Sequence, residues 1–351
     1  MPTEIVRLAP EHEPALLRFA ERVWTRPRSA DFVRWRYHEP PFHTAFLALR
    51  DGECLAMESA FRRPYRVGGR IVDFLEVFDW FTLPELRNSG LGVRIMQRFM
   101  KEPEPLLLVG GTADTQGLLP RLGWQVPARS RRWTLPIGLE RAARALARRT
   151  KLPAAAARAA APVARALSGR RPGRRFAPPG GRALPVALPG EELFALERGA
   201  SAYRTRPLWT RELLRWLVAG FAGGGQYLPF YFAVDGALRG FGLLRIYAHG
   251  DERLAEIVDA FAPDADAGLY AWIVNELVTV ADGFGVAEVA VSATCDALET
   301  ALRRSRFVET PSHPIQIWWP GGDGLPAPLA FGTSTGDQPI LPIVERWFPS
   351  P

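Results

Sequence analysis

Arg87-Asn88-Ser89-Gly90-Leu91-Gly92 is the segment from which the architecture of this chain can be worked out. An aromatic run typical of a β-strand, residues 74–81, precedes it, and an amphipathic run typical of a helix, residues 93–100, follows it. A glycine-containing turn between a strand and a helix leaves several backbone N–H groups without intrahelical partners, at the positive end of the helix dipole. Gly90 and Gly92 let a ligand approach the backbone closely. The segment therefore predicts a site for an anion such as a pyrophosphate.

Two further motifs flank this turn in a fixed order. Leu83-Pro84-Glu85-Leu86-Arg87 runs directly into it, and Leu122-Gly123-Trp124 follows about thirty residues later. Together the three motifs resemble the acyl-CoA signature of the GNAT (N-acetyltransferase) superfamily, in which V-x-P-x-x-R, R/Q-x-x-G-x-G/A and L-G-F occur in this order. An ordinary strand–turn–helix connection is the alternative interpretation of the turn.

Several fragments of the chain recur at a separation of 180–184 residues. Chance could produce any one of these matches, but four in the same order argue for two copies of one fold. The recurring pairs are 32–35 with 213–216, 48–52 with 232–236, 76–81 with 256–261, and 122–124 with 305–307.

Both copies contain the same succession of expected elements. A helical region is followed by a hairpin that turns at Asp51-Gly52 or Asp235-Gly236, then by a long strand, a helix, a buried strand, a second helix and a last strand. This succession indicates an α+β fold on a mixed sheet. It agrees with the resemblance, and we expect two tandem GNAT-like domains, each a mixed, mostly antiparallel sheet flanked by helices.

Changes in composition suggest where these domains begin and end. We expect an N-terminal GNAT domain with the acyl-CoA site at 1–137, a basic Ala/Arg/Pro-rich connector at 138–189, a degenerate GNAT-like domain at 190–319 and a Pro/Gly-rich tail at 320–351.

The net charge of +7 is concentrated in one segment. Residues 141–175 carry eleven Lys and Arg and no Asp or Glu, so the rest of the chain has a net charge of −4. We expect one or two short basic helices and a loose linker, which serve as a solvated connector. The alternatives are binding to nucleic acid or anionic lipid, and docking against acidic faces of the flanking domains.

The apolar runs and the cysteine and histidine positions predict neither a membrane span nor a metal site. No apolar run reaches the ~18–20 residues that span a bilayer, and the N-terminus lacks the apolar core of a secretory signal, so we expect no membrane span and a cytoplasmic location. Cys54, Cys295 and the five scattered histidines show no metal-ligand spacing, so we expect no metal. A duplicated fold can pair internally, which leaves a monomer or a homodimer open.

Acyl transfer from a thioester to an amine requires a positioned thioester, a stabilised oxyanion and a deprotonated amine. The resemblance implies acetyl-CoA or another acyl-CoA as co-substrate. It places a splayed strand near Phe81, Thr82 and Leu83, where a backbone N–H would meet the thioester carbonyl. Main-chain amides would then hold the pyrophosphate along Arg87, Asn88, Ser89, Gly90, Leu91 and Gly92.

Glu76 and Asp79 are the candidate catalytic carboxylates. The resemblance places Glu76 where many GNAT enzymes carry a catalytic Glu, and we prefer it as the base. Residues three apart on a strand face opposite sides, so both can enter one cleft only if the strand bulges. Glu256 and Asp259 repeat the pair in a copy that lacks the glycine turn, so a structural role is the alternative.

Further site residues follow from the same resemblance. Thr112 aligns with an Asn near the pantetheine arm, with helix capping as the alternative. Many GNAT enzymes carry a Tyr as general acid where this chain has Leu119, so the proton for the leaving thiolate must come from elsewhere or from water. Tyr37 and His38 lie where acceptor-binding residues usually occur, and they are the substrate candidates.

The second copy departs from the signature at the glycine turn. It carries Pro263-Asp264-Ala265-Asp266-Ala267-Gly268, which puts two carboxylates where a pyrophosphate would lie. Because like charges repel there, we expect this copy not to bind acyl-CoA in the usual way and to serve as a structural or acceptor-binding half.

The sequence therefore predicts an acyl-CoA-dependent N-acyltransferase, with acetyl transfer to the amine of a small molecule as the leading hypothesis. One alternative is a Fem-like transferase that uses aminoacyl-tRNA, because Fem-type enzymes also pair two GNAT-like halves and the basic connector could bind the tRNA. The other is a non-catalytic CoA-binding or scaffold protein, suggested by the missing Tyr.

Overall fold

The computed structural model describes residues 2–24, 29–138, 176–200, 202–220 and 225–320, with isolated positions inside 141–162. We call residues 2–138 the first half and residues 176–320 the second half. Apart from those isolated positions, the expected basic helices and linker lie outside the described residues, as does the expected tail beyond residue 320.

The first half contains the hairpin, long strand, helix and buried strand that the sequence predicts. α3 forms because its apolar residues recur on one face, where Leu91, Ile95, Met96 and Phe99 are buried. The strands are β1 (Glu4–Arg7), β2 (His43–Arg50), β3 (Glu53–Val67), β4 (Arg70–Thr82), β5 (Leu106–Val109) and β6 (Gln125–Pro136). The helices are η1 (Pro10–His12), α1 (Glu13–Val23), α2 (Ala30–Val33), η2 (Arg34–His38, a π-helix), η3 (Pro84–Leu86), α3 (Leu91–Phe99), α4 (Ala113–Leu118) and η4 (Leu119–Leu122).

The second half repeats this order with a longer helix after its long strand. Its strands are β7 (Gly181–Pro185), β8 (Thr205–Pro207), β9 (Gln226–Val234), β10 (Ala237–His249), β11 (Glu252–Phe261), β12 (Glu288–Ala293) and β13 (Val308–Trp318). Its helices are α7 (Glu191–Gly199), α8 (Arg211–Ala219), α9 (Ala267–Gly283) and α10 (Asp296–Arg304). β7 lies inside the range expected for the connector and pairs with β9.

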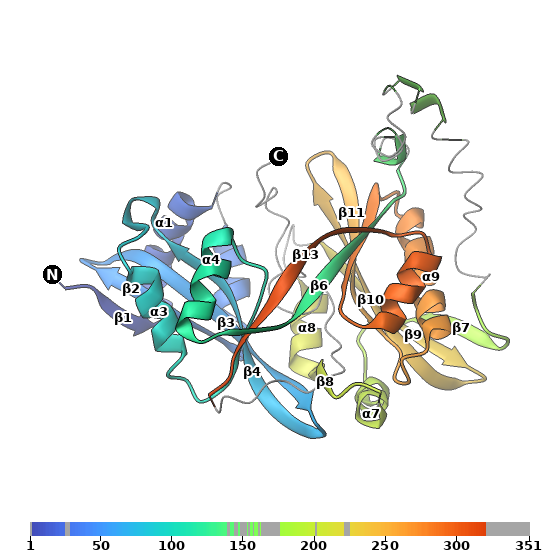
Figure 1. Ribbon diagram of the computed structural model, residues 1–351, viewed down its shortest axis with the longest axis horizontal. Helices are drawn as coiled ribbons and strands as arrows, with labels where there is room; N and C mark the ends of the chain where they lie inside the picture. The colour runs from blue at the N-terminus through green and yellow to red at the C-terminus, as the bar shows by residue number, and fades with distance from the viewer. Residues whose placement is uncertain are drawn as a thin grey trace.

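One continuous sheet passes through both halves (Figure 1). Among the described residues its order is β1-β2-β3-β4-β5-β13-β6-β12-β11-β10-β9-β7, and β8 pairs with β3 off this path. The pairs are antiparallel except β4 with β5 and β11 with β12. The predicted α+β class, with mixed and mostly antiparallel sheets flanked by helices, is confirmed.

The two halves exchange their last strands. β13 of the second half pairs with β5, and β6 of the first half pairs with β12, while β6 and β13 pair with each other in the middle of the sheet. Each buried parallel strand is therefore flanked by a strand from the other half. Each copy is continuous along the sequence, but the single sheet places the last strand of each copy among the strands of the other.

The repeated tryptophans of the two halves pack against each other. Trp35 of η2 and Trp216 of α8 stack with ring centroids 4.4 Å apart, and Trp216 Nε1 donates to the Trp35 carbonyl at 2.9 Å. Phe42 and Phe61 of the first half also contact the Trp216 ring. α8 thus covers part of the first half and joins the two copies through one apolar core.

Candidate active site

Strands β4 and β5 run side by side for only a short distance before they separate. Their parallel pairing joins Leu75 to Leu106 and Glu76 to Leu107, and no further pair follows among the described residues. Residues 77–82 of β4 continue along β3 on the other edge. The pairing of β4 with β5 therefore ends before residues 77–82.

A β-bulge bends this open part of β4. Asp79 and Trp80 together face Glu58 on β3, and Asp79 has a φ of +51°. The Asp79 carboxylate accepts from Arg36 Nε at 2.9 Å and from Tyr37 OH at 2.6 Å. Asp79 is therefore held in a buried ion pair with Arg36, and the Tyr37 hydroxyl is hydrogen-bonded to the same carboxylate.

Glu76 lies three residues before the bulge and is only 2% exposed. Tyr65 OH donates to Glu76 Oε1 at 2.5 Å, and Arg63 Nη1 lies 3.5 Å from the same oxygen. The two candidate carboxylates thus have different partners, although both belong to the same stretch of β4.

The glycine turn lies at the end of this strand, as the sequence predicts. α3 begins at Leu91, and Gly90 is its N-cap with a φ of +79°. Gly90 brings no side chain to the cap, and the Ser89 hydroxyl accepts only from the Leu91 N–H, at 3.3 Å. The N–H groups that follow in the first turn, those of Gly92 and Val93, have no intrahelical partner. The first turn of α3 therefore presents N–H groups and a positive dipole end without an acidic cap.

Gly92 joins the turn closely to β4. A β-carbon at residue 92 would lie 3.1 Å from Thr82 Oγ1 and 3.3 Å from Trp80 Nε1. Trp80 Nε1 donates to the Gly92 carbonyl at 3.1 Å, and the side chains of Arg87 and Asn88 are exposed next to the turn. The turn and the open edge of β4 are thus parts of one surface.

Residues 81–83 differ in whether their backbone N–H groups could donate to a thioester carbonyl. Phe81 packs edge-on against Trp24, with ring centroids 5.7 Å apart. The Leu83 N–H donates to the Leu55 carbonyl at 3.0 Å and is already used. Because successive N–H groups of a strand point to opposite edges, the N–H of Thr82 faces the open side.

Thr112 and Leu119 belong to the segment after β5. Thr112 Oγ1 accepts from the Thr115 N–H at 3.3 Å, so this side chain caps α4. Leu119, where a Tyr general acid is common in GNAT enzymes, is fully buried and carries no proton to donate. Thr112 contact with a pantetheine arm stays a prediction.

His38 lies apart from the Asp79 cluster. Its Nε2 is 4.0 Å from a carboxylate oxygen of Glu13 on α1, and burial lowers its pKa. Of the two predicted acceptor-binding residues, Tyr37 is buried against Asp79 and His38 is half-buried beside Glu13.

Several solved structures match this fold over most of the chain. A GCN5-related N-acetyltransferase from Anabaena variabilis matches at a TM-score of 0.59 and 12% identity, over 90% of this chain and 72% of that one. An N-myristoyltransferase from Saccharomyces cerevisiae with bound myristoyl-CoA matches at 0.59 and 12%, over 91% and 84%. A probable N-acyltransferase of unknown function from Enterococcus faecalis matches at 0.58 and 11%, over 90% and 72%. The chain has the GNAT fold.

Sequence comparison adds nothing to this likeness. No family model matches the chain, and no curated protein is similar to it. At identities of 11–12%, the structural neighbours establish the GNAT fold and leave the reaction to be argued from the site.

The second half repeats the strand order of the first half but caps the helix after its long strand with a carboxylate. Asp266 is the N-cap of α9, and its Oδ1 accepts from the N–H groups of Gly268 at 2.7 Å and Leu269 at 3.3 Å. One turn later Tyr270 is buried and hydrogen-bonded to Tyr203, with 2.7 Å between the hydroxyl oxygens. The N–H groups that α3 leaves open are therefore satisfied in α9 by the protein's own carboxylate.

β13 contributes residues to the first half that the sequence does not predict. Gly110, directly after β5, donates its N–H to the Pro314 carbonyl at 2.8 Å and accepts from Gln316 Nε2 at 3.0 Å. A β-carbon at residue 110 would lie 3.7 Å from Nδ1 of His313, whose pKa is lowered by burial. Only the strand exchange brings these residues to β5, and no local pattern signals it.

Glu58 is a second residue that the sequence analysis missed. It faces the bulge of β4, is fully buried, and burial raises the pKa of its carboxyl well above its usual range. Neither carboxyl oxygen has a hydrogen-bond partner among the described residues. Its place amid an apolar strand run, between Met57 and Ser59, could have marked it as unusual.

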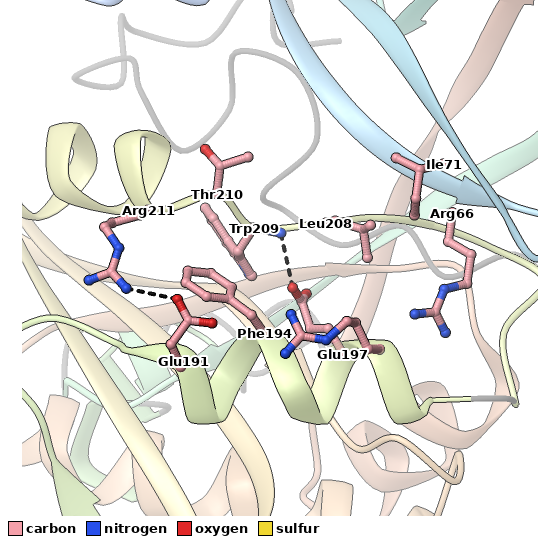
Figure 2. Close-up of a pocket in the computed structure, with 10 residues that line it drawn as sticks. Arg66, Ile71, Glu191, Phe194, Glu197, Leu208, Trp209, Thr210 and Arg211 are labelled. Carbon is pink, nitrogen blue, oxygen red and sulfur yellow. Dashed lines mark hydrogen bonds and ion pairs between the residues drawn. The ribbon is translucent and has the colours of Figure 1, made fainter.

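A separate cavity of about 380 Å³ lies where α7, the segment 208–211 and the β3–β4 hairpin meet (Figure 2). Arg66 and Ile71 reach it from the first half, and Glu197 and Trp209 from the second. The residues of the glycine turn are not among those that line it.

Within the part of the chain that the structure describes, no group of three or more His, Cys, Asp or Glu side chains could hold a metal ion. None of the helices described has the length and apolar character needed to cross a membrane. Cys54 is buried and Cys295 half-buried, and both are free thiols.

Proposed function

We propose that the first half binds an acyl-CoA and transfers its acyl group to the amine of a small molecule, most simply as an N-acetyltransferase. The observation that carries this proposal is the junction of two open backbone elements, the first turn of α3 and the separated edge of β4. Gly92 packs against Trp80 and Thr82 at this junction, so a ligand bound to one element reaches the other. The structural neighbour with bound myristoyl-CoA supports acyl-CoA as the co-substrate.

The proposed binding mode follows from the charges of the two elements. The pyrophosphate would lie on the N–H groups of Gly92 and Val93, where the helix dipole favours an anion and Arg87 adds a cation. The pantetheine arm would run along the open edge of β4 towards the bulge. The N–H of Thr82 would then donate to the thioester carbonyl and stabilise the oxyanion that forms during attack.

The proposed reaction exchanges a C–S bond for a C–N bond. An ammonium loses one proton, the neutral amine attacks the thioester carbon, and the tetrahedral intermediate expels the coenzyme A thiolate. A second proton leaves the nitrogen as the thiolate becomes a thiol. We propose Glu76 as the group that receives the amine proton, through water if it does not touch the amine, because Tyr65 and Arg63 fix its carboxylate beside the bulge.

A CoA-binding protein without catalysis is the second candidate. The buried Leu119 favours it, because the thiolate then lacks the usual proton donor. Coenzyme A thiolate is, however, a fairly good leaving group. The reaction can therefore proceed without a side chain that donates a proton to the thiolate. We therefore place catalysis first.

Thiol release from acetyl-CoA in the presence of a panel of small amines tests the proposal. Amine-dependent release above the hydrolysis rate supports N-acyl transfer. Saturable acetyl-CoA binding without turnover for any amine supports the non-catalytic candidate. Salt-dependent binding to tRNA without acetyl-CoA binding would favour the Fem-like alternative.

A further inference from the structure

The cavity in Figure 2 is built by both halves and lies away from the proposed acyl-CoA site. α7 supplies Phe194 and Glu197, the following segment supplies Trp209, and the β3–β4 hairpin of the first half supplies Arg66 and Ile71. Ile71 and the bulge are eight residues apart on β4, which is about 26 Å at the rise of a strand. The cavity is therefore a separate site.

One side of the cavity is apolar and held in place. Trp209 donates its backbone N–H to Glu197 at 3.2 Å and its indole N–H to Asp259 at 2.7 Å. Phe194 and Leu208 lie beside it, as Figure 2 shows. A rigid aromatic wall of this kind suits the apolar body of a small ligand, and a cavity of about 380 Å³ has room for one.

Ile71 continues this apolar side on the first half. Its side chain is 59% exposed, and the structure describes few other large apolar side chains as exposed. It is also a lining residue of the cavity. A ligand seated against Phe194 and Trp209 would cover part of this surface, which would otherwise remain in water.

The other side of the cavity carries an excess of positive charge. Arg206 Nη2 binds Glu197 at 2.8 Å, and Arg66 lies near enough that burial and the charge of Arg206 lower its pKa. The residues that line the cavity carry three guanidinium groups, those of Arg66, Arg198 and Arg211, against two carboxyl groups, those of Glu191 and Glu197. Arg211 does not add to the excess, because it is paired with Glu191 at 2.9 Å.

Two details of Arg66 and Arg206 favour an anion nearby, although Arg206 is not itself a lining residue of the cavity. Arg66 donates through Nη1 to the Ala200 carbonyl, which fixes its guanidinium at the cavity. Arg206 Nη1 is buried and has no hydrogen-bond partner among the described residues. A nearby anion would offset the repulsion between the guanidinium groups of Arg66 and Arg206. A carboxylate suits this role because its two oxygens match the planar N–H groups of a guanidinium.

We propose that this cavity binds a small amphipathic carboxylate, with its apolar body against Phe194 and Trp209 and its carboxylate facing Arg66. The site is independent of the acyl-transfer site. Binding here does not require that the first half bind acyl-CoA, so the two proposals succeed or fail separately.

Calorimetry with a matched pair of ligands tests this site on the full chain. Indole-3-acetate and indole-3-acetamide share an aromatic body and differ in charge. We expect saturable binding of the acetate, at least tenfold tighter than that of the amide. Equal affinities for the two, or no saturable binding of the acetate at millimolar concentration, would overturn the proposal.

Variants on β3 and β4 locate the binding. Arg66→Gln is expected to weaken acetate binding at least tenfold and to leave the amide unchanged. Arg62→Gln is the matched control, because Arg62 is on the same strand but pairs with Glu104 at 2.7 Å. Ile71→Asp puts a carboxylate at an exposed lining position, so it should weaken acetate binding without unfolding the chain. Loss of affinity in Arg62→Gln equal to that in Arg66→Gln contradicts the assignment.

A pH series gives a further readout of the same charges. Burial raises the pKa of Glu197 to about 7. The negative charge of Asp259 also raises it, and the positive charges of Arg206 and Arg63 lower it. Above that pH the ionised Glu197 offsets more of the positive charge, so the acetate should bind more weakly at pH 8 than at pH 6. Glu197→Gln should flatten this dependence, and an unchanged pH dependence in that variant would count against the site.

Discussion

The helices that follow the long strand in the two halves begin in opposite ways. The N-cap of α3 is Gly90, which has no side chain, and the first turn leaves N–H groups open beside the separated edge of β4. The N-cap of α9 is Asp266, whose carboxylate accepts from the N–H groups of Gly268 and Leu269. The same topology thus offers an anion site in one half and fills it internally in the other.

This difference separates what the fold needs from what a ligand needs. A helix start is stabilised when an acidic side chain accepts its first N–H groups, and α9 has this arrangement. α3 forgoes that stabilisation. Both halves still carry a buried Glu near an Arg and a Tyr, which are Arg63, Tyr65 and Glu76 in the first half and Arg245, Tyr247 and Glu256 in the second. The open cap, and not the buried Glu, is the feature that distinguishes the first half.

The largest expected effect comes from the repeated glutamates. Glu76→Gln should lower kcat/KM for acyl transfer by about 10²–10⁴-fold if Glu76 receives the amine proton. Glu256→Gln, the matched change in the second half, should leave kcat/KM unchanged, which steady-state kinetics measures. Equal losses in the two variants would mean that both glutamates are structural.

Trp216→Ala should lower the free energy of unfolding by about 3–5 kcal/mol, because it removes a buried ring that stacks on Trp35. Denaturant unfolding of Trp216→Ala, Trp35→Ala and the double variant measures the coupling of the halves. The losses should be less than additive, because each ring is the other's partner. Simple additivity would show that the two halves are stabilised independently.

The buried Glu197 should make stability depend on pH. Burial raises its folded-state pKa from 4.5 to about 7, so the folded state holds the proton more tightly than the unfolded state. The free energy of unfolding should therefore fall as pH rises from about 4.5 to about 7, by up to about 3 kcal/mol, and change no further above that range. Urea unfolding across this range measures the slope, which should be shallower in Glu197→Gln; an identical slope would contradict the assignment.

The smallest expected effect comes from the cap of α9. Asp266→Ala removes the acceptor for two N–H groups and should cost about 0.5–2 kcal/mol of unfolding free energy. It should not create a second acetyl-CoA site, because Tyr270 in the first turns of α9 remains buried and hydrogen-bonded to Tyr203. Denaturant unfolding and calorimetry check both points, and a second bound acetyl-CoA per chain would break the comparison.

Local patterns were enough to predict the strand, the turn and the helix around Gly90. The periodic apolar residues of α3 and the glycines before it act within a few residues, so the sequence displays them directly. The repeated fragments predicted the two copies for the same reason. The two carboxylates at residues 264 and 266 also predicted that the second half would not favour an anion, and Asp266 lies at the start of α9.

Contacts between distant segments could not be predicted in this way. The exchange of β6 and β13 brings His313 and Gln316 to Gly110, about two hundred residues away along the chain, and nothing near Gly110 signals it. The alternation of a strand showed that Glu76 and Asp79 could enter one cleft only if β4 bulges, and a bulge is present at Asp79. The ion pair of Asp79 with Arg36 depends on the position of η2, which the local sequence does not signal. The catalytic and binding roles of these residues stay predictions.

Acetyl-CoA binding measured by calorimetry tests the central claim most directly, on wild type, Gly90→Asp and Gly236→Asp. Gly90 and Gly236 have φ values of +79° and +81°, and a β-carbon at either meets no atom within 4 Å, so the two changes carry similar backbone strain. Only the first puts a carboxylate at the start of α3. We predict micromolar binding to wild type and to Gly236→Asp, and none to Gly90→Asp. No binding to folded wild type, or binding that survives Gly90→Asp, would contradict an acyl-CoA site in the first half.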